Sequence, residues 1–230
     1  MKNLKDILRD ISLFSSLDDS SIDKLSQAVR PVSLKQGEIL FFKGDEGNCM
    51  YIIREGTIKI VLPSVAGEEI IVTLLRENDF FGVMPMLDGE QRSADAVAVT
   101  HAEVFVLGRS DFLAILQSDI NALKTILYDL SQMIRKTDDL LGDLCFSPIS
   151  IRLTKKLLEL AETSGHVEGN TAYIDIPLTQ KEIGDMVGAT RESVNKELKI
   201  LREDKLIEMN SNKISIIDVG RMNLKALQLR

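Results

Sequence analysis

The sequence predicts an α+β protein in which an N-terminal antiparallel β-roll is joined by a long helix to a C-terminal winged helix-turn-helix. Apolar residues have helical spacing up to about residue 30, and short strand-like runs follow from about residue 32 to 107. Helical spacing then returns from residue 110 onward. We therefore expect three domains, with bounds at residues 1–109, 110–146 and 147–230.

The composition is typical of a cytoplasmic protein with no membrane partner. A chain of 230 residues is long enough for more than one core. No apolar run approaches the roughly 20 residues that span a bilayer. The first residues, MKNLKDILRDISLF, mix charged with apolar side chains and so lack the continuous apolar run of a secretory signal.

Metal-ligating and catalytic patterns are absent from the sequence. Its only cysteines are Cys49 and Cys145, and its only histidines are His101 and His166. These wide spacings match neither a disulfide framework nor a zinc signature. Neither histidine has a nearby Ser, Cys or Asp in a catalytic motif, and no phosphate-loop or dinucleotide fingerprint occurs. We therefore expect no metal and no enzyme.

Two short helices are predicted before the β-roll, and Ser20 and Ser21 are plausible caps for the second one. The roll should contain strands at residues 38–42, 50–55, 57–62, 69–75, 93–99 and 102–108, separated by glycine-rich turns. Strict alternation in the third strand should place Ile58, Ile60 and Leu62 on one face and Thr57, Lys59 and Val61 on the other.

A single uninterrupted helix is predicted from about Ser110 to Gly142. Alternating spacings of three and four residues define a heptad seam, which favours packing between two copies of the helix; it comprises Leu123, Ile126, Leu130, Met133, Thr137, Leu140 and Leu144. A second stripe should lie against the chain's own roll: Leu116, Ile120, Leu127, Ile134 and Leu141. The alternative is one amphipathic helix buried in a monomer, but two stripes need two partners.

The C-terminal region carries the pattern of a helix-turn-helix. After Pro148 breaks the long helix, a helix at 149–161, a loop at 164–170 and a short strand at 173–176 are expected. In LTQKEIGDMVGATRESVNKELKIL, Thr179 and Glu182 form a capping box, Gly188 suits a left-handed turn, and Thr190 caps a second helix. A hairpin wing should follow at 206–208 and 213–217, with its turn at Asn210-Ser211-Asn212.

The outward face of this second helix is expected to read DNA. Arginine can bond guanine O6 and N7 together, and glutamate can accept from cytosine N4. The region from residue 147 carries 13 Lys and Arg against 12 Asp and Glu, whereas residues 1–146 carry 15 against 23. The alternative to DNA reading is that the outward face of this helix is simply solvated. The candidate DNA-binding residues are Thr179, Lys181, Arg191, Glu192, Ser193, Asn195, Lys196 and Lys199.

At this point the chain resembles the cyclic-AMP receptor protein and fumarate–nitrate reductase regulator (CRP/FNR) family. The resemblance runs from about Leu13 to Ile217 and rests on GDEGNCMYIIREGTIKI, FFGVMPMLDGEQRSA and EIGDMVGATRESVNKEL. It implies a cyclic-nucleotide-binding-like roll, and a homodimer that binds double-stranded DNA at a palindromic operator and contacts RNA polymerase. It also implies base reading by Arg191, Glu192 and Lys196 at TGTGA-like half-sites. The cysteine cluster of the family's iron–sulfur branch is absent.

The segment from Phe81 to Ala94 resembles the family's phosphate-binding cassette. Gly82 permits close backbone approach, and Arg92 and Ser93 can bind an anion; the alternative is that Arg92 pairs with a nearby carboxylate. Val83, followed by Met84, stands where cyclic-AMP binders of this family have a ribose-binding glutamate, so cyclic AMP itself is doubtful.

Thr137 and Asp138 on the long helix correspond to the family's adenine-contacting pair, although a polar seam residue can also simply fix helix register. The effector therefore stays open among a cyclic nucleotide, a cyclic dinucleotide and an organic acid. Redox gating, a vestigial pocket in a constitutive regulator, and a nucleotide-sensing module that does not bind DNA are the remaining alternatives.

Overall fold

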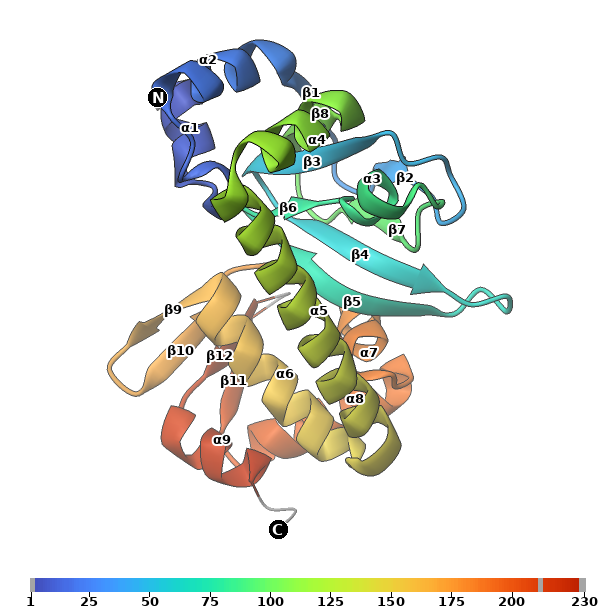
Figure 1. Cartoon of the computed structure of the whole chain (residues 1–230). Helices are drawn as coiled ribbons and strands as arrows, with labels where there is room; N and C mark the ends of the chain where they lie inside the picture. Colours follow the sequence, from blue (N-terminus) through green and yellow to red (C-terminus); the bar gives the residue numbers. More distant parts are fainter. Residues whose placement is uncertain (1–2, 211–212, 228–230) are drawn as a thin grey trace. The chain divides into compact units, whose positions relative to one another are not determined.

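The computed structural model describes residues 3–210 and 213–227 (Figure 1). The chain divides into two compact units, Met1–Arg135 and Lys136–Arg230, and the long helix α5 (Ile120–Phe146) contributes residues to both. The first unit contains antiparallel sheets and the second a helix-turn-helix with a small sheet. This confirms the predicted α+β class with a roll, a long helix and a winged C-terminal region.

Three short helical segments open the first unit: α1 (Leu4–Asp10), the 3-10 helix η1 (Ser12–Phe14) and α2 (Asp19–Ala28). The cap of α2 is Asp18, whose side chain accepts a hydrogen bond from the Ser21 backbone N–H at 2.7 Å. The prediction of Ser20 or Ser21 as cap is therefore wrong. The bond from Ser21 also lowers the pKa of the Asp18 carboxyl.

The roll consists of two four-stranded antiparallel sheets, in the orders β1-β8-β3-β6 and β2-β7-β4-β5. All six predicted strands are present. The strands β1 and β6 were not predicted: Pro31 interrupts the pattern of β1 at a sheet edge, and β6 has only two residues. The bounds are β1 (Arg30–Leu34), β2 (Ile39–Phe41), β3 (Cys49–Glu55), β4 (Ile58–Pro63), β5 (Glu69–Leu75), β6 (Phe80–Phe81), β7 (Asp95–Ala98) and β8 (Ala102–Gly108).

A β-bulge in β5 lies opposite the middle of β4, with Val72 as the extra residue. The pairing with β5 shifts between Ile60 and Val61, and beyond that point Val61 is buried while Leu62 is exposed. The predicted strict alternation is therefore wrong for the second half of the strand. The extra residue in β5 disrupts the regular pairing and increases the twist of the sheet beside this part of β4.

The helix after the roll is broken in two. The helix α4 (Arg109–Ser118) ends at Asp119, whose backbone is extended, and α5 begins at Ile120. The Asp119 carboxylate accepts bonds from the Asn121 N–H at 2.8 Å and the Ser16 hydroxyl at 2.6 Å. The predicted uninterrupted helix is therefore wrong, because an aspartate that bonds nearby backbone groups favours a helix start over a helix interior.

The two predicted apolar stripes are only partly placed as expected, since Leu116 on α4 is buried as predicted but several residues of α5 are exchanged. Ile126, expected in the dimer seam, is 1% exposed and packs in the core formed by the N-terminal helices and α4. Four residues expected against the roll are 56–62% exposed instead: Ile120, Leu127, Ile134 and Leu141. Periodicity identifies apolar stripes on a helix, but it does not say which partner each stripe meets.

The second unit is built around α6 (Ile149–Ser164) and a four-stranded antiparallel sheet of order β11-β12-β10-β9. The predicted loop at 164–170 contains the strand β9, and the C-terminal helix α9 was not predicted. The predicted wing is the β11–β12 hairpin; Ser211 and Asn212 of its turn lie outside the described residues. The bounds are β9 (Gly165–Glu168), β10 (Thr171–Ile174), α7 (Gln180–Val187), α8 (Arg191–Glu203), β11 (Ile207–Asn210), β12 (Lys213–Ile216) and α9 (Val219–Ala226).

Two negative findings hold for the described part of the chain. None of its helices has the length and apolar character needed to cross a bilayer. Its His, Cys, Asp and Glu side chains form no group of three or more that could hold a metal ion.

Candidate nucleic-acid interface and effector pocket

Local capping defines both helices of the helix-turn-helix. At the start of α7, the Glu182 N–H donates to the Thr179 hydroxyl at 3.2 Å, and the Thr179 N–H donates to the Glu182 carboxylate at 3.0 Å. Gly188 ends α7 in a left-handed conformation with φ of 59°. Thr190 then caps α8 by accepting from the Ser193 N–H at 3.2 Å. The capping box, the glycine turn and the second cap are confirmed.

Arg152 holds the end of α7 and was missed by sequence reasoning. From α6, its Nη1 donates to the carbonyl oxygens of Val187 at 2.5 Å and of Gly188 at 3.4 Å. A cation at the C-terminal end of a helix satisfies carbonyls that have no partner within the helix. Sequence spacing carried no signal for this contact, since 35 residues separate Arg152 from Val187.

The helix α8 presents the predicted polar face to solvent. Val194, Leu198 and Leu201 are buried on its inner side. The outer side exposes Arg191, Glu192, Asn195, Lys196 and Lys199. These five residues share one accessible face at the N-terminal and middle turns, which is the arrangement that base reading in a major groove requires.

The partners of the candidate side chains differ. In the described chain, Arg191, Glu192 and Lys196 make no ion pair, whereas Lys199 lies 3.8 Å from Glu203. Lys181 on α7 pairs with Asp185 at 2.8 Å. The hydroxyl of Ser193 lies 3.0 Å from that of Thr190, and so takes part in the cap.

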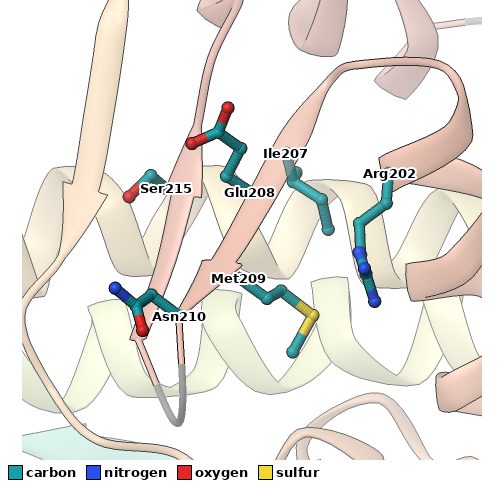
Figure 2. Close-up of a pocket in the computed structure, with 6 residues that line it drawn as sticks. All are labelled: Arg202, Ile207, Glu208, Met209, Asn210 and Ser215. Atoms are coloured by element: carbon teal, nitrogen blue, oxygen red, sulfur yellow. The ribbon is translucent and has the colours of Figure 1, made fainter.

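A hollow of about 500 Å³ lies beside the wing, at the far end of α8 (Figure 2). Figure 2 shows Met209 and Arg202 pointing to one side of the β11–β12 hairpin and Glu208 and Ser215 to the other. The hollow is separate from the predicted effector residues Gly82 and Arg92, which belong to the first unit.

The predicted phosphate cassette begins with a glycine that the backbone requires. Gly82 has φ of +80°, and a Cβ there would lie 2.6 Å from Nη1 of Arg92. The helix α3 (Met84–Asp88) follows, with Val83 as its cap residue. The close approach that Gly82 permits is thus made by the guanidinium of Arg92.

Arg92 is almost fully buried, with 4% of its surface exposed. Its guanidinium donates to the carbonyl oxygens of Gly82 at 2.9 Å and Cys49 at 2.7 Å. It also lies over the ring of Phe41, with Cζ 4.3 Å from the centroid. The alternative in which Arg92 pairs with a carboxylate is wrong for the described residues, since none of its partners is acidic.

The other effector candidates differ in their surroundings. Ser93 is exposed and its hydroxyl lies 3.9 Å from the sulfur of Met84. Val83 is buried in the core that includes Met86 and Phe112. Thr137 and Asp138 are exposed on α5 and belong to the second compact unit.

Tyr51, whose ring also lies near Arg92, has a phenol group with a shifted pKa. Burial raises the pKa of this group well above its ordinary value, and a hydrogen bond from the Cys49 thiol at 3.3 Å acts in the same direction. Tyr51 is therefore neutral throughout the physiological range.

Two family models match the chain, one in each half: a cyclic nucleotide-binding domain over residues 31–119 and a Crp-like helix-turn-helix domain over residues 151–224. The global nitrogen regulator of Synechococcus elongatus is 30% identical, covering 85% of this chain and 90% of its own length. The chain belongs to the CRP/FNR family of DNA-binding transcription regulators.

Other members of the CRP/FNR family match along nearly the whole chain. The CRP-like cAMP-activated global transcriptional regulator of Mycobacterium tuberculosis is 29% identical, covering 97% of this chain and 100% of its own. The solved structure of a CRP/FNR-family regulator from Thermus thermophilus matches with a TM-score of 0.72 and 25% identity, covering 86% of this chain and 98% of that one. Both matches cover the roll and the helix-turn-helix together.

Proposed function

We propose that this chain is a cytoplasmic, homodimeric regulator that reads a palindromic operator with α8 and contacts RNA polymerase. The observation that carries the proposal is the exposed polar face of α8, the second helix of a capped helix-turn-helix. On this face, Arg191 and Glu192 have no ion-pair partner in the described chain. An arginine–glutamate pair in the first turn suits G·C base pairs of TGTGA-like half-sites. The functional domains would be 1–109 for sensing, 110–146 for dimerisation and 147–230 for DNA.

The exposed stripe of α5 supports the homodimer. Together with half-buried residues it forms a continuous pattern of alternating three- and four-residue steps: Ile120, Leu123, Leu127, Leu130, Ile134, Thr137, Leu141 and Leu144. Such a heptad favours pairing of two helices along a shared axis. The proposed dimer seam thus includes four large apolar residues that are exposed in the single chain, namely Ile120, Leu127, Ile134 and Leu141.

The proposed effector is an anionic small molecule that binds at Arg92, with a cyclic nucleotide as the first candidate. The family model over the roll and the cAMP-activated relative support this choice. Val83 supplies no carboxylate for a ribose hydroxyl, so a cyclic dinucleotide or an organic acid is the second candidate. Gating then requires that the effector bind the DNA-competent arrangement more tightly than the other.

The deciding experiment is calorimetric titration of the full chain with cyclic AMP, cyclic GMP, cyclic di-GMP and 2-oxoglutarate. The same samples are then tested on DNA with a TGTGA-type palindrome and on a scrambled duplex. We expect one ligand to bind and to raise affinity for the palindrome alone. Binding of a ligand with no preference for the palindrome would instead identify a nucleotide-sensing module. Selective DNA binding with no ligand bound would identify a constitutive regulator.

A further inference from the structure

Arg92 is a buried cation whose charge no carboxylate neutralises among the described residues. Its hydrogen-bond acceptors are neutral, namely the Gly82 and Cys49 carbonyl oxygens and the Cys49 sulfur at 3.6 Å. Its Nε is buried and has no hydrogen-bond partner in the described part of the chain. Burial of a charge is unfavourable unless other groups compensate for the lost water. Something else in the roll must therefore stabilise this guanidinium.

Two aromatic rings supply that stabilisation. Cζ of Arg92 lies 4.3 Å from the centroid of Phe41 and 5.5 Å from that of Tyr51, within the range of cation–π attraction. The negative face of a ring attracts a cation but carries no net charge. The rings therefore hold the guanidinium in place without neutralising it.

The rings are themselves fixed by a third aromatic residue. Tyr51 stacks on Phe81 at 5.2 Å and on Phe41 at 5.6 Å between centroids. Phe41 comes from β2 in one sheet of the roll, whereas Tyr51 and Phe81 come from β3 and β6 in the other (Figure 1). The three stacked rings thus connect both sheets, and the packing of the roll core fixes their position.

We propose that Phe41 and Tyr51 are positioning residues that hold Arg92 as an uncompensated cation for the anionic group of the effector. This inference rests on the proposed effector site at Arg92. A phosphate or carboxylate group would supply the missing counter-charge, and Arg92 would need little further ordering. An acidic partner would also hold Arg92, but it would compete with the anion. The aromatic stack avoids that competition.

The test compares variants of the full chain by calorimetric titration with two probes, cyclic AMP and inorganic phosphate. Phe41→Leu removes the ring beneath Arg92, and Phe41→Tyr restores it. Phe105→Leu makes the same change at a buried phenylalanine in the other core of the first unit, and so controls for loss of packing. Arg92→Gln removes the charge. Circular dichroism and thermal unfolding establish that each variant is folded.

We expect Phe41→Leu to bind both probes roughly 5- to 10-fold more weakly than the wild type, whereas Phe41→Tyr and Phe105→Leu retain wild-type affinity. Arg92→Gln should bind neither probe. If Phe41→Leu binds normally while Arg92→Gln does not, or if Phe105→Leu loses as much affinity as Phe41→Leu, the positioning role is wrong but the anion site stands. If Arg92→Gln binds normally, or the wild type binds neither probe, the effector site itself is wrong.

Discussion

At the scale of single residues, Arg191 and Glu192 are accessible because the neighbouring residues fix the helix without covering these two side chains. Thr190 caps α8 and Val194 anchors its inner side, so the first turn is rigid while its outer side chains stay in water. Neither side chain is held by a neighbour in the described chain. The buried residues thus fix the helix, while these two side chains stay accessible for the proposed base contacts.

Replacing Arg191 with alanine should relax specificity at one base pair of each half-site. A bidentate arginine–guanine contact contributes about 1–3 kcal/mol of discrimination, so the loss should be concentrated at that position. Binding to a panel of half-sites with single substitutions measures this. Lys24→Ala, an exposed cation in the first unit, is the matched control. A uniform loss across all sequences would identify Arg191 as a phosphate contact instead.

Asp129 on α5 should lower the free energy of unfolding at neutral pH. Burial raises the pKa of its carboxyl, and the Asp79 carboxylate raises it further. Because the pKa is higher in the folded than in the unfolded state, folding favours the protonated carboxyl. The stability of the fold therefore falls as pH rises through the folded-state pKa. Asp129→Asn should therefore raise the melting temperature at pH 7, and the gain should vanish below the ordinary carboxyl pKa of about 4. Asp139→Asn, at an exposed position of the same helix, should give no such gain.

At the scale of elements, the orientation of α8 depends on the turn that precedes it. Gly188 adopts a left-handed conformation, and a Cβ there would lie 2.4 Å from the Leu144 side chain. Arg152 bonds the carbonyls of Val187 and of Gly188 itself. The start of α8 is therefore positioned by α5 and α6 as well as by its own cap.

Loss of the Arg152 hydrogen bonds to the Val187 and Gly188 carbonyls should lower both the free energy of unfolding and the affinity for DNA. Arg152→Met keeps an unbranched side chain but leaves the Val187 carbonyl without its donor, so unfolding should become easier by about 1–3 kcal/mol. Affinity for DNA should fall equally for all operator variants, because no base contact is removed. Urea unfolding and the same half-site panel measure the two effects. Arg152→Lys should recover part of the stability; a specificity change confined to one base would contradict this role.

At the scale of the whole molecule, α5 exposes large apolar side chains in the single chain. Leu127 and Ile134 are more than half exposed in the single chain, whereas Ile126, next to Leu127 in the sequence, is buried in the core. The same helix therefore has one side that completes the fold of the first unit and another that remains free for a second copy.

Leu127→Lys should dissociate the proposed dimer without unfolding the chain. Burial of one leucine contributes about 1.5–3 kcal/mol, and each dimer would lose two of them, so the dissociation constant should rise by about a hundredfold or more. Analytical ultracentrifugation over a dilution series measures it. Tyr128→Lys is the control, since Tyr128 is similarly exposed but lies outside the heptad stripe. Equal effects of the two variants would contradict the proposed seam.

Features that depend on neighbours along the chain were determined by the sequence alone. The capping box of α7, the left-handed Gly188, the cap of α8 and its inner apolar side all arise from residues within a turn or two of one another, so local spacing predicted them. The six glycine-bounded strands were predicted for the same reason.

Only the tertiary structure decided the features whose partners lie far apart in the sequence. The bulge in β5 depends on its pairing with β4, and the break at Asp119 includes a bond from Ser16. Arg92 meets Phe41 and Cys49, which lie more than forty residues earlier in the chain. Which stripe of α5 is buried depends on how the N-terminal helices pack. Spacing reports the period of a pattern, whereas the partner is chosen by the packing of distant segments.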